Sequence, residues 1–177
     1  ICGYDAGTLM LLDAIAEEVD LNEHQVVIFA PRTRPPEVPP HFAWIQGDPT
    51  KESELGKVRL THASTALVVG ARDVPPSHAD ARTILTVFTV RSFLGEQPLT
   101  EQRQRPLYVV TEILDAENVD HARSAGADEV IETTRLGFSL LAHTITQPGT
   151  AALMSRVGVK GTQNIYVGAI PEDVAIP

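Results

Sequence analysis

Short apolar runs alternate with amphipathic segments along the first three quarters of the chain. Gln25–Ala30 is a continuous, mostly apolar run, which is typical of a strand that is buried on both faces. In Gly7–Val19 the apolar residues recur three and four positions apart, which predicts a helix with one apolar face. The whole pattern predicts six strands, at Ile1–Gly3, Gln25–Ala30, Phe42–Gln46, Ala66–Val69, Leu107–Thr111 and Glu129–Glu132.

Helical patterns fill the intervals between these strands. A short helix is expected to end near Val58, and a long helix is expected to begin with Ser77 as its N-cap. A further helix is expected at Asp115–Ala125, where Gly126 ends it. This alternation predicts an α/β fold with a doubly wound, Rossmann-like parallel sheet of about six strands.

The pattern changes after residue 133, where a helical segment is followed by the Pro148–Gly149 break and a second short helix at Ala151–Val157. Asn164–Val167 has the pattern of a further strand. We expect residues 1–133 to form a Rossmann-like domain, and residues 134–177 to form a helix–turn–helix crossover arm and the start of a truncated C-terminal segment. The arm either packs on its own domain or forms a dimer interface, because an apolar stripe without a local partner usually pairs with another subunit. The stripe consists of Leu136, Leu140, Leu141 and Ile145.

Composition and charge narrow the range of functions. The 177 residues carry 14 Lys and Arg against 23 Asp and Glu, which gives a net charge of −9. A duplex nucleic-acid binder needs a basic face, so this balance argues against nucleic acid as a partner. The single cysteine, Cys2, excludes an internal disulfide framework and any zinc site with several cysteines. No apolar run reaches the roughly 18 residues that a membrane span needs, and the opening Ile1–Gly3 suggests a fragment of a longer chain.

The first glycine-rich turn departs from the dinucleotide-binding fingerprint. That fingerprint has glycines at the first, third and sixth positions of a hexapeptide, whereas Gly3–Thr8 has Asp5 third and Thr8 sixth. The aspartate adds a side chain and a negative charge where a pyrophosphate would lie. No carboxylate follows the second expected strand until Glu37, and Arg32 stands there either as a phosphate contact or as a solvated surface residue. An NAD site of the usual kind is therefore disfavoured.

Three segments of the chain together resemble the RCK family. They are the turn ICGYDAGT at the start of the chain, GDPTKESEL at Gly47–Leu55 and VVTEILDAENVDHARSAGADEVI at Val109–Ile131. RCK domains, also called KTN or TrkA-N domains, are cytoplasmic regulator-of-K⁺-conductance domains of potassium channels and transporters. The resemblance covers most of the chain and implies a Rossmann-like fold with a helical crossover after the sixth strand.

The resemblance implies a non-catalytic, ligand-sensing domain of a prokaryotic ligand-gated potassium channel. It places the domain at the cytoplasmic face of the cell membrane, the fragment itself being soluble. Such domains pair with themselves across the crossover, as a dimer or within an octameric ring, and the ring acts on a membrane-embedded pore. In the family the ligand is a nucleotide in the Rossmann cleft or a divalent cation such as Ca²⁺.

The resemblance also implies candidate residues for each role. For an adenine nucleotide such as AMP or ADP, these are Gly3, Tyr4, Asp5, Gly7, Arg32 and Asp48. For a divalent cation, these are Glu112, which matches a family carboxylate, and Asp115. Two further family carboxylate positions hold Gly70 and Leu114, although Ca²⁺ takes about six to eight oxygen ligands. For a subunit interface, these are Leu136, Leu140, Leu141, Ile145 and Met154.

Two other functions stay open at this point. One is a Rossmann-fold, NAD(P)-dependent oxidoreductase or epimerase subunit, a class that usually supplies a catalytic Tyr and Lys, or a His, from a substrate domain. Here the lysines Lys51, Lys57 and Lys160 have no tyrosine at helical spacing. The other is a structural gating-ring subunit that binds no ligand, which Asp5 and Leu114 would both fit. The regulatory domain is the expectation, and no enzyme activity is expected.

Overall fold

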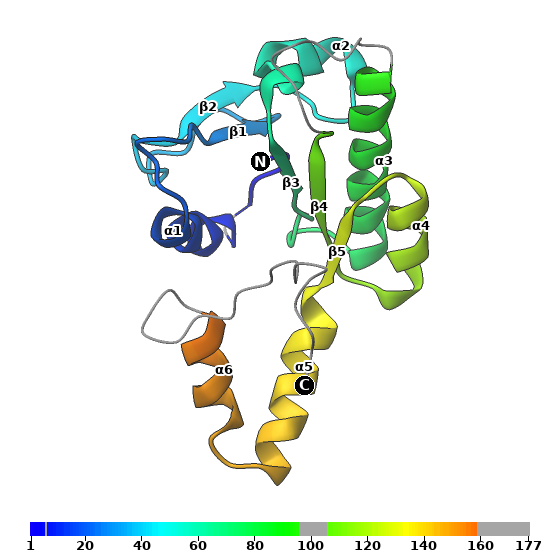
Figure 1. Cartoon of the computed structure of the whole chain (residues 1–177). Helices are drawn as coiled ribbons and strands as arrows, with labels where there is room; N and C mark the ends of the chain where they lie inside the picture. The colour runs from blue at the N-terminus through cyan, green and yellow to red at the C-terminus, as the bar shows by residue number, and fades with distance from the viewer. Residues whose placement is uncertain (6, 96–105, 159–177) are drawn as a thin grey trace, which may run out of the picture. The chain divides into compact units, whose positions relative to one another are not determined.

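The computed structural model describes residues 1–5, 7–95 and 106–158 (Figure 1). The chain divides into two compact units, with the boundary after Ser139. The first unit contains a parallel α/β sheet, and the second contains the end of helix α5 together with helix α6. None of the helices in the described residues combines the length and the apolar character that crossing a bilayer requires. The strand expected at Asn164–Val167 lies outside the described residues.

Five strands form the sheet, and every strand pair is parallel. Cys2 joins two groups of strands, because it forms parallel bridges to Phe29 on one side and to Val68 on the other. The resulting order, β2–β1–Cys2–β3–β4–β5, is that of a doubly wound sheet. The strands are β1 (Val27–Ala30), β2 (Ala43–Gln46), β3 (Thr65–Val68), β4 (Tyr108–Ile113) and β5 (Glu129–Glu132).

The parallel α/β fold agrees with the sequence-based expectation, but the number of strands differs. The first expected strand, Ile1–Gly3, is reduced to one bridging residue, because three residues are too few for the repeated bridges of a strand ladder. This segment still makes sheet-like backbone bonds, since Cys2 N donates to Leu67 O at 2.8 Å and Gly3 N donates to Phe29 O at 3.0 Å. The expectation of about six strands is therefore not confirmed: the described chain has five strands and one bridging residue.

The helices follow the expected order, with two local corrections. Helix α3 begins at Pro76, so Ser77 lies within its first turn and is not its N-cap. The fixed φ of proline suits the first helical position, and Pro75 O accepts from the N–H groups of His78 and Ala79. The helix expected at Asp115–Ala125 is split into a 3₁₀ turn and a short α-helix. The elements are α1 (Thr8–Glu18), α2 (Glu52–Leu55), α3 (Pro76–Gly95), α4 (Val119–Ser124), α5 (Thr133–Thr146) and α6 (Thr150–Gly158), with 3₁₀ turns η1 (Gly56–Val58), η2 (Leu60–His62) and η3 (Ala116–Asn118).

Successive side chains of β1 belong to two different cores. Ile28 and Ala30 pack with Leu12 of α1, whereas Phe29 packs with Val87 of α3. All five side chains are fully buried or nearly so. Helices α3 and α4 lie side by side next to β4 (Figure 1). Both faces of β1 are thus covered, which is why its sequence is a continuous apolar run.

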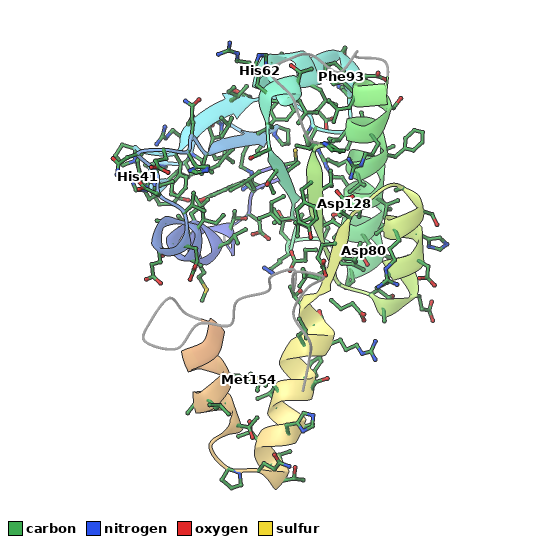
Figure 2. All side chains as sticks on the ribbon, viewed as in Figure 1. His41, His62, Asp80, Phe93, Asp128 and Met154 are labelled. Carbon is green, nitrogen blue, oxygen red and sulfur yellow. The ribbon has the colours of Figure 1, made fainter. Side chains whose placement is uncertain are left out.

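Arg91 of α3 ties this helix to the turn between α4 and β5. Its guanidinium donates to Gly126 O at 2.7 Å, to Leu107 O at 2.8 Å and to Asp128 Oδ2 at 2.5 Å (Asp128 is labelled in Figure 2). Asp128 Oδ2 also accepts from Val109 N at 2.6 Å. Gly126 has a φ of 106°, and a Cβ there would lie 2.8 Å from Arg91 Cγ, so the turn requires glycine. The A-G-A-D motif at residues 125–128 therefore has a structural role.

We predict that Arg91→Leu lowers the free energy of unfolding by about 2 kcal/mol, because two backbone carbonyls and one carboxylate lose a charged donor. Urea denaturation of the variant and the wild type measures this change. Arg123→Leu is the matched control, since Arg123 makes an exposed ion pair with Asp120, and it should cost less than about 0.5 kcal/mol. Equal losses in the two variants would show that Arg91 does not brace the turn.

Candidate functional site

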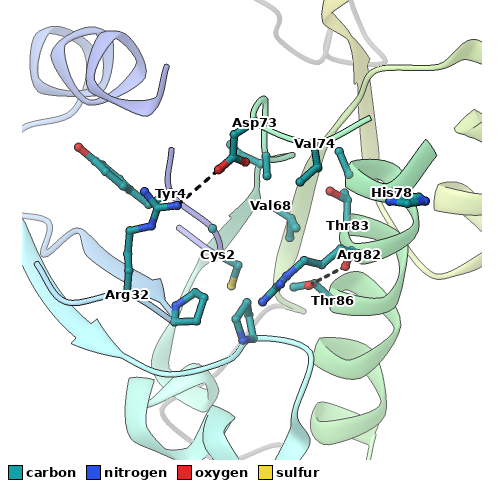
Figure 3. Close-up of a pocket in the computed structure, with 16 residues that line it drawn as sticks. Cys2, Tyr4, Arg32, Val68, Asp73, Val74, His78, Arg82, Thr83 and Thr86 are labelled. Atoms are coloured by element: carbon teal, nitrogen blue, oxygen red, sulfur yellow. Dashed lines mark hydrogen bonds and ion pairs between the residues drawn. The ribbon is translucent and has the colours of Figure 1, made fainter. Parts of the chain in front are cut away.

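A cavity of about 350 Å³ lies at the carboxyl ends of β1 and β3 (Figure 3). Because β1 and β3 lie on opposite sides of Cys2, the cavity is at the point where the strand order reverses. Ligands of doubly wound sheets bind at this point. The lining comes from the first turn (Cys2, Gly3, Tyr4), the end of β1 (Pro31, Arg32), Pro49, the end of β3 and the following loop (Val68, Val69, Ala71, Asp73, Val74) and α3 (His78, Ala79, Arg82, Thr83, Thr86).

Gly3 and Tyr4 form the start of the turn that leaves the sheet. Gly3 has a φ of 100°, and a Cβ there would lie 2.7 Å from Val69 O, so the position requires glycine. The Tyr4 side chain is 7% exposed, and its ring meets Trp44 edge-on with the ring centroids 5.1 Å apart. Burial raises the pKa of the Tyr4 hydroxyl, and the negative charge of Glu37 adds to this rise. Among the described residues its oxygen has no hydrogen-bond partner, so Tyr4 contributes mainly to the core.

Asp5 is a buried carboxylate that holds the turn before α1. Its Oδ1 accepts from Gly7 N at 2.9 Å and from the backbone and side chain of Thr8, both at 3.1 Å. Its Oδ2 accepts from Arg72 N, in the loop after β3, at 2.7 Å. Gly7 has a φ of −74°, so its own conformation does not require glycine. The Asp5 carboxylate therefore uses the N–H donors that a phosphate would use at this helix end.

Two arginines approach the cavity from opposite sides (Figure 3). Arg32 follows β1, and its Nη2 lies 3.9 Å from Asp73 Oδ2, with both side chains half exposed or more. Arg82 extends from α3 and donates to Asp48 Oδ1 at 3.1 Å. The same Oδ1 accepts from Thr50 N at 3.2 Å and from Thr50 Oγ1 at 2.8 Å. Burial raises the pKa of Asp48, but the Thr50 hydrogen bonds and the Arg82 charge outweigh it and hold the pKa below its usual value.

A second cavity, of about 200 Å³, contains Glu112, the candidate metal ligand from β4. The Glu112 carboxylate is 6% exposed and accepts from Arg72 Nη2 at 2.5 Å and from Thr133 Oγ1 at 2.7 Å. Asp115 makes a separate contact, since its Oδ1 accepts from Glu117 N at 3.1 Å and caps η3. Within the described ranges no group of three or more His, Cys, Asp or Glu side chains could hold a metal ion. A calcium ion does not fit Glu112 in this arrangement, because the carboxylate already binds the Arg72 guanidinium.

Comparison with protein families decides the family of this chain. A family model described as the calcium-activated potassium channel slowpoke-like RCK domain matches residues 11–122, which is more than half of the chain. The chain belongs to the RCK-domain family.

This RCK domain is similar to proteins of known type over most of its length. It is 26% identical over 152 residues to the calcium-gated potassium channel TvoK of Thermoplasma volcanium, covering 84% of this chain and 40% of TvoK. The chain thus spans about two fifths of this curated relative. The human SLO3 gating ring matches with a TM-score of 0.66 and 14% identity, over 95% of this chain and 30% of that chain. The GsuK channel bound to ADP matches with a TM-score of 0.57 and 19% identity, over 99% and 46% of the two chains.

Three polar residues of the RCK domain were not among the candidates from the sequence. Arg72 and Arg82 extend from the loop after β3 and from α3, and each binds a candidate carboxylate. Asp80 is fully buried and accepts from Leu114 N, Asp115 N and Asn118 Nδ2, all at 2.9 Å (Asp80 is labelled in Figure 2). The sequence signal that could have found them is their place directly after a buried strand or in the first turns of the helix that follows it.

The candidate interface residues of α5 and α6 are mostly exposed. Among them, Leu140 is half-buried. Ile145, at 83%, is the most exposed of the large apolar side chains among the described residues. Phe138 of α5 is also exposed and was not among the candidates. The exposed candidates are Leu136, Leu141, Ile145 and Met154.

We predict that Tyr4→Phe raises the free energy of unfolding by about 1 kcal/mol, because it removes a buried hydroxyl that lacks a partner. Since the folded pKa of Tyr4 lies above its unfolded value, the wild type also loses stability as the pH rises above about 10, and the variant lacks this loss. Urea denaturation at neutral and alkaline pH measures both effects.

Tyr108→Phe is the matched control for this prediction. The Tyr108 side chain is half exposed, and its hydroxyl donates to Glu129 Oε2 at 3.3 Å. Its removal should change the free energy of unfolding by less than about 0.5 kcal/mol. A loss of stability in Tyr4→Phe at neutral pH would contradict the assignment of an unpartnered hydroxyl.

Proposed function

We propose that this chain is the cytoplasmic regulatory domain of a potassium channel, where it forms part of a gating ring and transmits ligand binding to a membrane-embedded pore. Membership of the RCK family and the likeness to the SLO3 gating ring support this proposal. TvoK, a calcium-gated potassium channel, is similar over most of this chain. Such a role needs a ligand with different affinities for two states of the ring and no bond chemistry.

The ligand that the geometry supports best is an adenine nucleotide in the cavity at the carboxyl ends of β1 and β3. The observation that carries this proposal is the coincidence of the cavity with the point where the strand order reverses. Gly3 lets the turn approach β3, Asp5 and Gly7 hold the turn before α1, and Tyr4 supports it from the core. Arg32 supplies positive charge at the cavity, while Asp48 and Arg82 fix the GDPT turn beside it. GsuK has been solved with ADP and with NAD, which adds support for this ligand class.

A divalent cation at Glu112 and Asp115 is the second candidate ligand, and the similarity to calcium-gated TvoK favours it. The contacts in the chain support it less well. Glu112 is paired with Arg72 and Thr133, and Asp115 caps a 3₁₀ turn. A calcium ion would have to displace the guanidinium and recruit further oxygen ligands, because it takes about six to eight.

An enzyme is the alternative function of another class. A Rossmann-fold oxidoreductase or epimerase commonly presents a tyrosine and a lysine to its substrate. Tyr4 lines the cavity, but its hydroxyl is buried, and no lysine is among the described lining residues. These features favour a binding domain over a catalytic one.

We expect adenine nucleotides to raise the thermal midpoint of the chain, because a ligand that binds only the folded state adds about 2.7 kcal/mol at a hundredfold excess over its dissociation constant. Ala71→Leu, which adds volume in the cavity lining, should abolish the shift. Ala14→Leu, at an exposed position of α1, should leave it unchanged. Thermal denaturation with AMP, ADP, NAD and Ca²⁺ in turn measures these shifts.

Each other outcome of this panel contradicts the nucleotide proposal. A shift with Ca²⁺ alone would favour the metal site. No shift with any ligand would favour a structural gating-ring subunit with an empty cleft. A nucleotide shift that survives Ala71→Leu would place the nucleotide elsewhere on the chain.

We also propose that residues 134–177 form a crossover arm through which two copies of the chain pair, within a dimer or an octameric ring. The apolar side chains on α5 and α6 support this proposal, because large exposed apolar surfaces usually mark interfaces. The proposed contact residues are Leu136, Leu140, Leu141, Ile145 and Met154.

We predict that Ile145→Asp shifts the chain from dimer to monomer in size-exclusion chromatography with light scattering, because an unpaired charge in an apolar interface is costly. Ser139→Asp is the matched control, since it adds the same charge at an exposed polar position of the same helix and should leave the mass unchanged. An unchanged mass for Ile145→Asp would contradict the proposed interface.

A further inference from the structure

The N-terminal end of α1 has its backbone donors bound by the chain itself. Gly7 N and Thr8 N both donate to Asp5 Oδ1, and Thr8 Oγ1 donates to it as well. The Asp5 side chain is buried, so this anion lies at the helix end with little access to water. A pyrophosphate at the same place would meet a buried negative charge and find these donors already used. A nucleotide with a 5′-diphosphate therefore fits this turn poorly.

The loop after β3 strengthens this arrangement. Asp5 Oδ2 accepts from Arg72 N at 2.7 Å, so the carboxylate has partners in two separate segments of the chain. The Arg72 side chain is turned to Glu112 and lines the second cavity, not the first. It therefore supplies no positive charge to a phosphate placed between α1 and the first cavity.

Positive charge is available at the opposite wall of the first cavity. Arg32 follows β1, where dinucleotide-binding folds have a carboxylate for the ribose hydroxyls or an arginine for a phosphate on the ribose. Its side chain is half exposed, and its contact with Asp73 at 3.9 Å is too long for a hydrogen bond. Arg82 is bound more closely, at 3.1 Å, by Asp48. Arg32 is thus the lining arginine with the looser ion pair, and Figure 3 shows it at the cavity wall next to Tyr4.

We propose that the cleft selects an adenosine nucleotide whose phosphate is a monoester on the 2′ or 3′ oxygen of the ribose, bound by Arg32, and that Asp5 excludes ligands with a 5′-diphosphate. This inference rests on the proposed nucleotide site and specifies which nucleotide it takes. The phosphate would replace Asp73 as the partner of Arg32 and gain a bidentate contact with the planar guanidinium. The ring of the ribose would then lie over the turn at Gly3, where the absence of a side chain leaves room.

Isothermal titration of the full chain with adenosine 2′-monophosphate, adenosine 3′-monophosphate, AMP, ADP and NAD tests this proposal. At least one of the first two nucleotides should bind about tenfold or more tightly than ADP and NAD. Arg32→Ala should weaken that binding by about 10- to 100-fold, which is typical for the loss of a charged hydrogen bond to phosphate. Arg123→Ala removes the same charge from the exposed surface of α4 and should change it by less than about twofold.

Asp5→Asn and Asp5→Gly test the excluding role of the carboxylate. Asn keeps an acceptor for the turn but removes the charge, and Gly removes both, so ADP binding should improve in either variant that folds. Thermal denaturation shows whether each variant is folded. The asparagine variant keeps the test decisive if the glycine variant is not.

The outcomes separate this inference from the proposed function. If ADP or AMP binds the wild type more tightly than both ribose phosphates, the selectivity is wrong while the nucleotide site stands. If Arg32→Ala leaves the affinity unchanged, Arg32 is not the phosphate ligand. If no nucleotide binds at millimolar concentration, both the inference and the proposed nucleotide site are overturned.

Discussion

The backbone of Cys2 and Gly3 holds the two halves of the sheet together. Cys2 N donates to Leu67 O at 2.8 Å, Val69 N donates to Cys2 O at 3.0 Å, and Gly3 N donates to Phe29 O at 3.0 Å. Among the described residues these bonds join β1 to β3, which otherwise belong to separate strand groups. The chain then has to leave the sheet beside Val69, which only a glycine with positive φ allows. The cavity follows from this constraint, because the strands on either side of Cys2 continue into loops that diverge.

The buried carboxylates of this domain serve its loops. Asp5 holds the turn before α1, Asp80 holds the loop after β4, and Glu112 binds Arg72 and Thr133. Each lies at or near the carboxyl ends of the strands, where a family of ligand-sensing domains could have used it for a metal ion or a nucleotide. Because their hydrogen bonds are formed within the chain, none of the three needs an external cation to be stable when buried. The charged group left with the weakest internal pairing at the first cavity is Arg32, which is why the electrostatics favour an anionic ligand there.

The sequence alone predicts the fold better than it predicts the site. Burial on both faces of β1 requires a continuous apolar run, so Gln25–Ala30 is visible in the sequence without any partner. The start of α3 was placed at Ser77 because serine caps helices, but proline at the first helical position prevails. The charge at Asp5 was visible too, and its effect on phosphate could be argued from the glycine fingerprint. Its partner Arg72 could not be predicted, because the two residues are 67 positions apart and meet only when the loops of the folded sheet converge.

The loop after β3 connects the two cavities. Ala71 and Asp73 line the first cavity, whereas Arg72 lines the second. Asp73 is the ion-pair partner of Arg32, and Arg72 binds Glu112, which also binds Thr133 at the first residue of α5. Adjacent residues in a short loop share rigid peptide planes, so they cannot be displaced independently. A ligand that separates Arg32 from Asp73 therefore acts on the same loop that holds Glu112 and the start of α5. Regulation requires only that the ligand bind one arrangement of this loop more tightly than another.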